Sequence, residues 1–369
     1  MESAVVGLPY VGKTTLFNLL TGAHAATGTL AGAEAAANVG VAKVPDERLD
    51  LLAALFKPKK TTHAEVRYTD VGLTRGAGKG EGIAAQRLGE LRTSDALVHV
   101  VRAFRDPAVP HVEGDVDPAR DVGVFELELL VADLGLVERR IARLEPELRA
   151  ARAGEHQVKE REMALLRRVH GALAAGTPVR DLDLDDAERR SLRGFGLLSE
   201  KPQLVVVNLD ESDLGRQEAV TGLVRGALSA HRRTAITAVC AKIEAEVAEL
   251  PAAEGAAFRR ELGFAESPLQ RIVRETYALL GVLSFFTVDE NEVRAWTIPA
   301  GTAAQEAAGM IHSDMARGFI RAEVIQWDDL LELGGLAEAR AKGKLHIEGR
   351  GYVVQDGDVV HVLFNVGPR

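Results

Sequence analysis

The residues best suited to chemistry stand near the amino terminus, in the run Gly7-Leu8-Pro9-Tyr10-Val11-Gly12-Lys13-Thr14. This run fits the pattern G-x-x-x-x-G-K-[ST], between an apolar segment that predicts a strand and the run Leu16–Leu20 that predicts a helix. Glycines let backbone N–H groups approach phosphate oxygens, while Lys13 can reach the β- and γ-phosphates and Thr14 can bind Mg²⁺. The positive end of the following helix dipole also faces the anion. We therefore predict a site for a nucleoside triphosphate.

A second group of residues is expected where Mg²⁺ and the γ-phosphate would be. Asp70 ends an apolar strand, so its carboxylate would meet Mg²⁺ directly or through water, with a surface aspartate at a strand end as the alternative. The glycine-rich segment that follows predicts a switch that orders against a γ-phosphate and relaxes after its loss. Leu73 stands where GTPases often carry a glutamine that orients water, which an aliphatic chain cannot do. The switch residues are Gly72, Gly76, Gly78, Gly80 and Gly82, with Arg75 and Lys79 between them.

Two further segments are candidates for contact with the base. Asn208-Leu209-Asp210-Glu211 is similar to the G-protein pattern Asn-Lys-x-Asp, whose aspartate accepts two hydrogen bonds from guanine. Here Leu209 replaces the lysine, and Glu211 is one methylene longer than aspartate. A displaced carboxylate weakens guanine selection, because an unpaired buried polar partner costs about 1–3 kcal/mol. The alternative for this segment is an ordinary polar turn at a strand end. Cys240-Ala241-Lys242 argues against that alternative, because it follows the next strand, where the second base-contacting loop belongs.

The length and composition indicate several globular domains. A chain of 369 residues is expected to hold about two or three domains, and 46% hydrophobic with 27% charged residues is ordinary for such proteins. No apolar run approaches the roughly 20 residues that a membrane helix needs, and the first strand is expected too close to Met1 for a signal peptide. Cys240 is the only cysteine, which excludes an internal disulfide and fits a cytoplasmic protein. The net charge of −9 argues against broad electrostatic capture of nucleic acid, although a local basic face remains open.

Short apolar segments bounded by turn residues predict a mainly parallel sheet with helices between its strands. This pattern is typical of the doubly wound α/β class, which binds ligands at the carboxyl ends of its strands. The expected strands are Ala4–Gly7, Ala64–Asp70, Ala96–Val101, Leu204–Asn208 and Ala235–Cys240.

The alternation is interrupted by a pattern that predicts an antiparallel helical hairpin. Apolar residues recur at alternating spacings of three and four from Leu127 to Leu148, and after a turn at Gly154 a looser stripe runs from Val158 to Leu173. The hairpin is either an arm that binds a partner or a structural insertion, since amphipathicity does not separate the two. Arginines that could meet phosphates, diluted by neighbouring glutamates, are Arg139, Arg140, Arg143, Arg149 and Arg152.

From about Ser284 the pattern changes to a small α+β module. The predicted organisation is a nucleotide domain over residues 1–126 and 199–283, the hairpin over 127–198, and the module over 284–369. Within the module we expect strands at Arg294–Ile298, Ile320–Ile325, Tyr352–Gln355 and Val359–Phe364, and a helix at Ala303–His312.

With these elements in place, the chain resembles the YchF family of Obg-related phosphate-loop NTPases over nearly its whole length. The resemblance implies that the final module is a TGS domain with a ubiquitin-like β-grasp fold, that ATP is favoured over GTP and hydrolysed slowly, and that the protein is linked to ribosomes. It also matches His111 to the family's candidate catalytic histidine, with a solvated loop histidine as the alternative. The resemblance is carried by Gly7–Thr15, Asn38–Val41, Val44–Leu49, Gly76–Gly82, Asn208 with Glu211, Cys240–Glu246, Arg294–Ile298 and Gln355–Asp358.

Three departures from the family pattern concern hydrolysis. Tyr10 stands where the family usually has asparagine, at a position connected with dependence on a monovalent cation. The segment Ala33–Ala37 lacks the switch threonine whose hydroxyl would bind Mg²⁺. One residue is missing between Asp70 and Gly72, which shifts the amide that would meet the γ-phosphate. We therefore expect a low or altered rate of hydrolysis.

The leading hypothesis is a cytoplasmic ATPase whose nucleotide state changes its binding to ribosomes or another RNA-containing translation partner, with no membrane partner. The rival is a nucleotide-binding interaction module with negligible turnover. A third reading, an Obg-type GTPase, requires a lysine and an aspartate that Leu209 and Glu211 do not provide. The candidate catalytic residues are Lys13, Asp70 and His111, and the candidate Mg²⁺ ligands are Thr14 and Asp70. The candidate nucleotide contacts are Gly7, Pro9, Tyr10, Val11, Gly12, Lys13, Thr14, Thr15, Gly72, Asn208, Leu209, Glu211, Cys240, Ala241 and Lys242.

Overall fold

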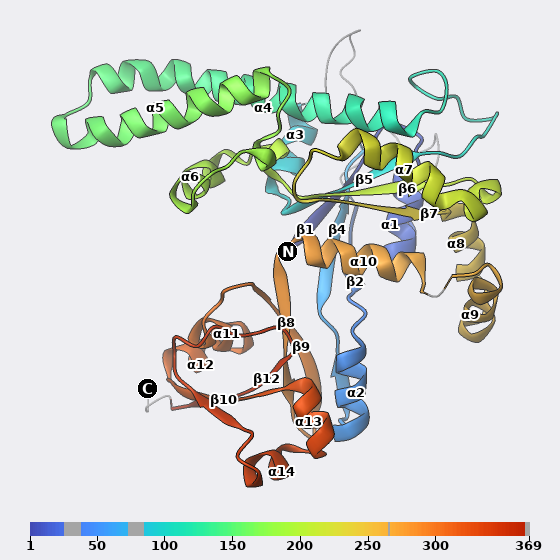
Figure 1. The fold of residues 1–369 in the computed structure, drawn as a ribbon, viewed down its shortest axis with the longest axis vertical. Helices are drawn as coiled ribbons and strands as arrows, with labels where there is room; N and C mark the ends of the chain where they lie inside the picture. The colour runs from blue at the N-terminus through green and yellow to red at the C-terminus, as the bar shows by residue number, and fades with distance from the viewer. Residues whose placement is uncertain (26–37, 73–84, 265, 366–369) are drawn as a thin grey trace. The chain divides into compact units, whose positions relative to one another are not determined.

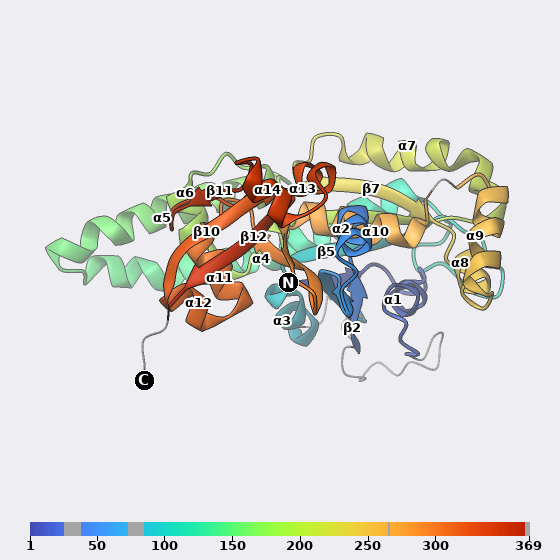
Figure 2. The ribbon, with the colours of Figure 1, turned by 90° about the horizontal axis from the view of Figure 1, so that it is seen from below.

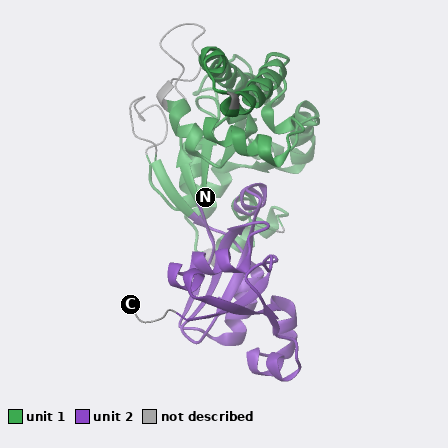
Figure 3. Cartoon of the chain, turned by 90° about the vertical axis from the view of Figure 1, so that its left-hand side faces the viewer, with its two compact units in different colours: residues 1–41, 67–272 green, residues 42–66, 273–369 purple. Residues whose placement is uncertain are grey.

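The computed structural model describes residues 1–25, 38–72, 85–264 and 266–365 (Figure 1). The chain divides into two compact units, residues 1–41 with 67–272 and residues 42–66 with 273–369 (Figure 3). Residues 42–66, which reach into the start of the second predicted strand, therefore group with the C-terminal residues. None of the helices in these described parts is long and apolar enough to cross a bilayer.

The first unit is built on a six-stranded sheet with the strand order β2-β4-β1-β5-β6-β7. The pairs of β1 with β4 and β5, of β5 with β6, and of β6 with β7 are parallel. Strands β5 and β6 are buried along their whole length, as expected for valine-rich strands covered on both faces. All five predicted strands are confirmed, with small shifts at their ends. The bounds are β1 (Glu2–Val6), β2 (Asn38–Lys43), β4 (Glu65–Asp70), β5 (Ala96–Arg102), β6 (Gln203–Asn208) and β7 (Thr234–Val239).

Helices connect these strands, which confirms the doubly wound class. Leu91 of α3 and Phe125 and Leu129 of α4 pack with Ala4 and Leu97 of the sheet. The helices of this part of the chain are α1 (Lys13–Thr21), α3 (Ala85–Thr93), α4 (Pro118–Arg149), α5 (Ala153–Ala174), α6 (Asp186–Leu192), α7 (Gln217–Leu228), α8 (Ala241–Ala248), α9 (Ala252–Glu261) and α10 (Pro268–Leu279), with short 3-10 helices η2 (Val179–Asp181), η3 (Arg193–Phe195), η4 (Leu198–Glu200) and η5 (Glu211–Arg216).

The predicted helical hairpin is confirmed as α4 and α5, which lie side by side (Figure 1). Val137 and Leu144 of α4 pack with Leu166 and Val169 of α5 in a core of their own. The turn predicted at Gly154 is wrong, because the chain reverses at residues 150–152 and Gly154 lies in the first turn of α5. Helix α4 begins at Pro118, well before the predicted start of the hairpin, so one continuous helix belongs both to the sheet's covering layer and to the hairpin.

A buried carboxylate holds the base of the hairpin. The Asp133 side chain of α4 has no exposed surface and accepts hydrogen bonds from the N–H groups of Leu198 and Ser199, at 3.0 and 2.8 Å. Arg92 of α3 lies 3.2 Å from the same carboxylate. A buried charge is tolerated only when it is paired and hydrogen-bonded, so this network fixes α4 against the returning chain at η4.

The second unit contains a sheet with the order β11-β10-β12-β8-β9-β3. Strands β10 and β12 run antiparallel side by side (Figure 2), β8 and β9 form a hairpin, and α11 packs on the core around Phe285 and Phe319. This arrangement confirms the predicted α+β module. The bounds are β3 (Lys60–Thr62), β8 (Val282–Val288), β9 (Glu292–Pro299), β10 (Phe319–Gln326), β11 (His346–Glu348) and β12 (Asp358–Phe364), with α2 (Glu47–Phe56), α11 (Ala304–Ile311), α12 (Ser313–Arg317), α13 (Trp327–Leu333) and α14 (Leu336–Ala341).

One predicted strand of this module is wrong. Residues 352–355 form an isolated bridge between Val353 and Ala303 rather than a strand. The cause is the buried carboxylate of Asp358, which accepts hydrogen bonds from the Tyr352 hydroxyl and the Gln355 N–H, at 2.9 and 2.8 Å, and so bends the segment into a turn.

Strand β5 carries a fully buried histidine. The His99 ring lies 4.2 Å from that of Phe125, centroid to centroid, and its Nδ1 is 3.0 Å from the Gln203 side chain. Burial, followed by the charges of Lys13 and Arg180, lowers the pKa of His99 from 6.5 to about 3. The folded protein therefore keeps this side chain neutral.

We expect the free energy of unfolding to fall as the pH drops below about 6.5, by up to about 1.4 kcal/mol per pH unit from His99 alone. The unfolded chain takes up a proton there that the folded chain refuses until the pH nears its lowered pKa. His99→Gln should reduce this slope, and the matched change of exposed His346 should not. Urea unfolding at several pH values measures it, and an unchanged slope in His99→Gln would contradict the prediction.

Candidate nucleotide site

The loop between β1 and α1 has the backbone shape that its glycines permit. Gly7 and Gly12 have φ angles of 143° and 93°, which L side chains rarely adopt, and Tyr10 has a φ of 63°. A Cβ atom on Gly7 would lie 2.3 Å from the Val100 carbonyl oxygen, and one on Gly12 would lie 2.5 Å from Nδ2 of Asn208. Both glycines are therefore required, which supports the predicted phosphate-binding loop.

Lys13 begins α1, and its side chain is buried beneath this loop. Its ammonium group donates a hydrogen bond to the Leu8 carbonyl oxygen at 2.7 Å. Burial lowers the pKa of Lys13 to about 8, and the nearby charge of Asp70 opposes the shift. A phosphate oxygen in place of the carbonyl would give the ammonium a charged partner, so the loop holds a cation ready for an anion.

Thr14 and Asp70 come together at the carboxyl ends of β1 and β4, as the sequence predicts. The Thr14 hydroxyl donates to Oδ2 of Asp70 at 2.7 Å, while the buried Oδ1 has no hydrogen-bond partner within the described residues. Burial raises the pKa of Asp70, against the Thr14 hydrogen bond and the charges of Lys13 and Arg87. An oxygen pair with one unused carboxylate oxygen fits a hard cation such as Mg²⁺. Within the described ranges, no group of three or more His, Cys, Asp or Glu side chains is placed to hold a metal ion.

Asn208, at the end of β6, joins three segments of the site. Its Nδ2 donates to the Val11 carbonyl of the phosphate loop at 3.0 Å, and its Oδ1 accepts from the Ala241 N–H at 3.1 Å. Its own carbonyl accepts the Ala103 N–H after β5, at 2.9 Å. The predicted base-contacting segments 208–211 and 240–242 therefore do lie together, beside the phosphate loop.

The side chains of these two segments divide between core and surface. Leu209 and Cys240 are buried in one apolar cluster with Val101, and burial raises the pKa of the Cys240 thiol. Glu211 and Lys242 are exposed and form an ion pair. The carboxylate at the predicted base-selecting position is therefore paired with a lysine in the first turn of α8.

His111 lies in the loop between β5 and α4, and its side chain is buried, so the alternative of a solvated loop histidine is wrong. Nδ1 accepts the Glu113 N–H at 3.1 Å, which places the proton of the neutral ring on Nε2. Nε2 lies 2.8 Å from Oδ2 of Asp121, whose side chain is 2% exposed. Nδ1 is thus hydrogen-bonded, whereas Nε2 faces the Asp121 carboxylate at ion-pair distance without hydrogen-bond geometry. No hydrogen bond or ion pair within the described residues joins His111 to the phosphate loop.

Two residues that shape the loop between β5 and α4 are absent from the sequence prediction. The buried guanidinium of Arg102, at the end of β5, donates to the Phe104 and Val109 carbonyls at 3.1 and 2.9 Å. Asp121, in the first turn of α4, faces His111. The sequence signal for these two residues was their position alone. A charged residue at the end of a buried strand or in the first turn of a covered helix needs a polar partner.

The remaining predicted residues are placed as follows. Pro9 and Thr15 are half-buried on the loop and on α1, Tyr10 is exposed, and Gly72 is exposed at the end of the described segment 38–72. The predicted switch residues from Leu73 to Gly82, and the segment Ala33–Ala37, lie outside the described residues.

The chain resembles known proteins over its full length. Residues 2–120 match a family model described as "50S ribosome-binding GTPase", and residues 282–365 match the YchF-GTPase_C model, described as "Protein of unknown function (DUF933)". The Bacillus subtilis (strain 168) protein named ribosome-binding ATPase YchF is 40% identical, with 99% of this chain and 100% of the relative covered. The protein of that name from Escherichia coli O157:H7 is 39% identical, with 99% of each covered.

A solved structure, that of the Schizosaccharomyces pombe YchF GTPase, matches with a TM-score of 0.87 and 31% identity, over 98% of this chain and 97% of that chain. The match includes the phosphate-loop unit with its hairpin and the C-terminal unit. Sequence identity across nearly the whole of both chains agrees with this shared architecture. We conclude that the chain belongs to the YchF family of phosphate-loop NTPases.

Proposed function

We propose that this protein is a slow, Mg²⁺-dependent ATPase whose nucleotide state regulates its binding to ribosomes in the cytoplasm. The observation that carries the proposal is the phosphate loop with its buried Lys13 and the Thr14–Asp70 pair, in a chain 40% identical over its length to a ribosome-binding ATPase. We assign three parts of the chain to this ATP-dependent binding: the nucleotide domain (1–126 and 199–283), the hairpin (127–198) and the TGS module (284–369).

The chemistry of such a site is positioning and charge neutralisation. Lys13 would exchange the Leu8 carbonyl for phosphate oxygens, and Thr14 and Asp70 would hold Mg²⁺. Bound Mg²⁺ would neutralise charge between the β- and γ-phosphates. The basic nitrogen of the neutral His111 ring, Nδ1, already accepts the Glu113 N–H, so this side chain is not a free general base. This supports slow turnover in the absence of a partner.

Base selection should favour ATP. Guanine is recognised by a free carboxylate that accepts two N–H groups, whereas the Glu211 carboxylate is paired with Lys242. Adenine has no donor at N1 or C2, so it does not need that carboxylate. The rival assignment as an Obg-type GTPase lacks this recognition.

We predict that calorimetry finds tighter binding of ATP than of GTP. Glu211→Asp combined with Lys242→Ala frees and shortens the carboxylate, and should move the preference toward GTP by about tenfold, the effect of a hydrogen bond to a charged group. Leu209 is left unchanged because it is buried in the core. Glu218→Asp on α7 is the matched control. Tighter GTP binding by the unaltered protein would sink the proposed base selection.

Turnover by the purified protein should stay far below the rate of about 10 s⁻¹ that is typical of enzymes. Lys13→Ala should abolish ATP binding, because it removes the cation buried under the phosphates. His111→Ala should leave ATP affinity unchanged, since its ring contacts Asp121 rather than the loop. Single-turnover assays then decide the role of His111. A lower rate of hydrolysis in His111→Ala, with no change in the control His156→Ala at an exposed histidine, would assign it a catalytic role. Fast turnover without a partner would contradict the proposal.

The hairpin is the part of the first unit with arginines available for RNA phosphates. Arg140 is engaged by Glu147 and Glu162, at 3.1 and 2.8 Å. The other hairpin arginines that were predicted to meet phosphates make no ion pair with any described residue. They are Arg139, Arg143, Arg149 and Arg152. The same hairpin has its own core, so it can hold these side chains on a rigid arm.

Charge reversal of these four arginines should weaken co-sedimentation with ribosomes, and the loss should be largest at low salt and shrink as salt rises, because the variant makes fewer phosphate contacts. The same reversal at Arg216 and Arg225, elsewhere in the first unit, is the control. Binding should also differ between an ATP analogue and no nucleotide. Equal binding in both states, with no effect of the reversals, would favour the rival, an interaction module with incidental nucleotide. Deletion of residues 284–369 is avoided because it would strip the sheet partners of β3.

A further inference from the structure

Residues 42–66, here called the crossover segment, belong to the fold of the C-terminal unit although they lie between two strands of the nucleotide unit's sheet. The segment follows the start of β2 and leads into β4. Its strand β3 pairs in parallel with β9, with Lys60 opposite Glu292 and Thr62 opposite Arg294. Leu49 and Leu52 of its helix α2 are fully buried. The crossover segment therefore supplies an edge strand and a covering helix to the C-terminal unit.

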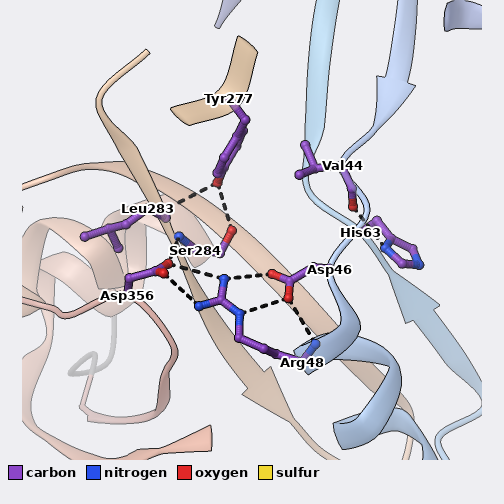
Figure 4. Close-up of polar contacts among 8 residues, drawn as sticks. All are labelled: Val44, Asp46, Arg48, His63, Tyr277, Leu283, Ser284 and Asp356. Carbon is purple, nitrogen blue, oxygen red and sulfur yellow. Dashed lines mark hydrogen bonds and ion pairs between the residues drawn. The ribbon is translucent and has the colours of Figure 1, made fainter. Parts of the chain in front are cut away.

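One arginine ties this segment to the rest of the C-terminal unit (Figure 4). Arg48 pairs with Asp46 through Nε and Nη2, both at 2.9 Å, and with Asp356 through Nη1 at 2.7 Å. Asp356 also accepts the Ser284 N–H at the start of β8, at 3.0 Å. The Arg48 guanidinium lies 5.3 Å from the centre of the Phe286 ring. Paired, planar contacts of this kind fix orientation as well as adding energy.

A second set of contacts fixes the other end of the segment. The Thr62 hydroxyl donates to Glu292 at 2.6 Å, and the Lys60 ammonium lies 3.3 Å from the same carboxylate. Lys59 donates to the Asn291 side chain at 2.9 Å. These bonds lie immediately before β4, so the point at which the chain leaves the C-terminal unit is pinned to β9.

From that point the chain runs directly to the nucleotide site. Strand β4 begins at Glu65 and ends at Asp70, whose carboxylate holds the Thr14 hydroxyl. It is locked to β1 in a fixed register, with Val5 opposite Asp70. This register keeps β4 from slipping against β1, since a one-residue slip would turn every side chain to the opposite face. Asp70, at the end of β4, is therefore joined to Thr62 on β3 by the strand and the two residues between them, 63 and 64.

We propose that the crossover segment couples the two units: binding of Mg²⁺ and ATP at Thr14 and Asp70 changes the C-terminal unit through β4, β3 and the Arg48–Asp356 contact. Arg48 is a positioning residue in this coupling. Because a coupling free energy is reciprocal, a partner bound to the C-terminal unit changes the affinity for ATP by the same factor. The inference rests on the proposed function in taking Mg²⁺ and ATP as the ligands.

The chain contains its own reporter for this coupling. Both of its tryptophans, Trp296 and Trp327, lie in the C-terminal unit. Trp296 is on β9, where Arg294 lies 4.0 Å from its ring centre, and the backbone N–H of Trp327 donates to the Gly357 carbonyl beside Asp356, at 3.1 Å. Tryptophan emission therefore reports on the C-terminal unit while the nucleotide binds in the other unit.

The experiment titrates the full chain with Mg²⁺ and a non-hydrolysable ATP analogue, following tryptophan emission and, in parallel, the heat of binding. We expect a saturable change in emission with the same midpoint as calorimetry, and no change in Lys13→Ala. Arg48→Met should still bind the analogue but lose about half or more of the emission change. Arg48→Lys, which keeps the charge, should retain more of it. Arg317→Met, which removes an arginine paired with Asp314 in the same unit, is the matched control.

Calorimetric binding with no emission change in the unaltered protein would overturn the coupling, and so would a full emission change in the Arg48 variants. No heat of binding at all would instead contradict the proposed function. If Arg48→Met does not fold, Asp356→Asn tests the same contact, since it preserves shape and leaves the Arg48–Asp46 pair intact. It should show the same loss of amplitude, and a full amplitude would again overturn the proposal.

Discussion

The nucleotide site depends above all on one buried amide. Asn208 is 4% exposed and uses both polar atoms of its side chain, one on the phosphate loop and one on the segment that begins α8. An asparagine can donate and accept at once, which a hydrophobic or singly charged side chain cannot do. Its Nδ2 lies 2.5 Å from where a Cβ on Gly12 would be, so any side chain at position 12 would displace the amide. Loss of the amide or of this glycine would separate the phosphate end of the site from the base end.

Two buried ionisable side chains lie close to each other in this site. Lys13 and Asp70 are both buried. Burial lowers the pKa of Lys13 and raises the pKa of Asp70, so it disfavours the charged form of each group. The cost is offset by the Leu8 carbonyl and the Thr14 hydroxyl, which are partners that phosphate and a metal ion can replace. A site that is polar, buried and incompletely satisfied is suited to a charged ligand, because the ligand completes hydrogen bonds that the protein has already oriented.

Polar contacts between residues distant in sequence fix segments within each unit. Asp133 ties the hairpin to the segment returning at Ser199, and Arg48 ties the crossover segment to Asp356. Helix α4 adds a covalent continuity, since it runs from Asp121, which faces His111, into the hairpin.

The sequence by itself determined the elements whose causes are local. The valine-rich runs predicted the parallel strands, and the glycine pattern predicted the loop that holds Lys13 and Thr14, because backbone permissiveness and hydrophobic periodicity are read within a few residues. It also predicted Thr14 and Asp70 as ligands of one Mg²⁺ ion, and their side chains are hydrogen-bonded to each other. Only the tertiary structure decided that residues 42–66 complete the other unit's sheet, that His111 is buried against Asp121, and that Asp358 turns residues 352–355 away from a strand. Each of these depends on a polar partner distant in sequence or on a buried charge, and the energy of such a contact is set by where the fold places both groups, which local pattern does not encode.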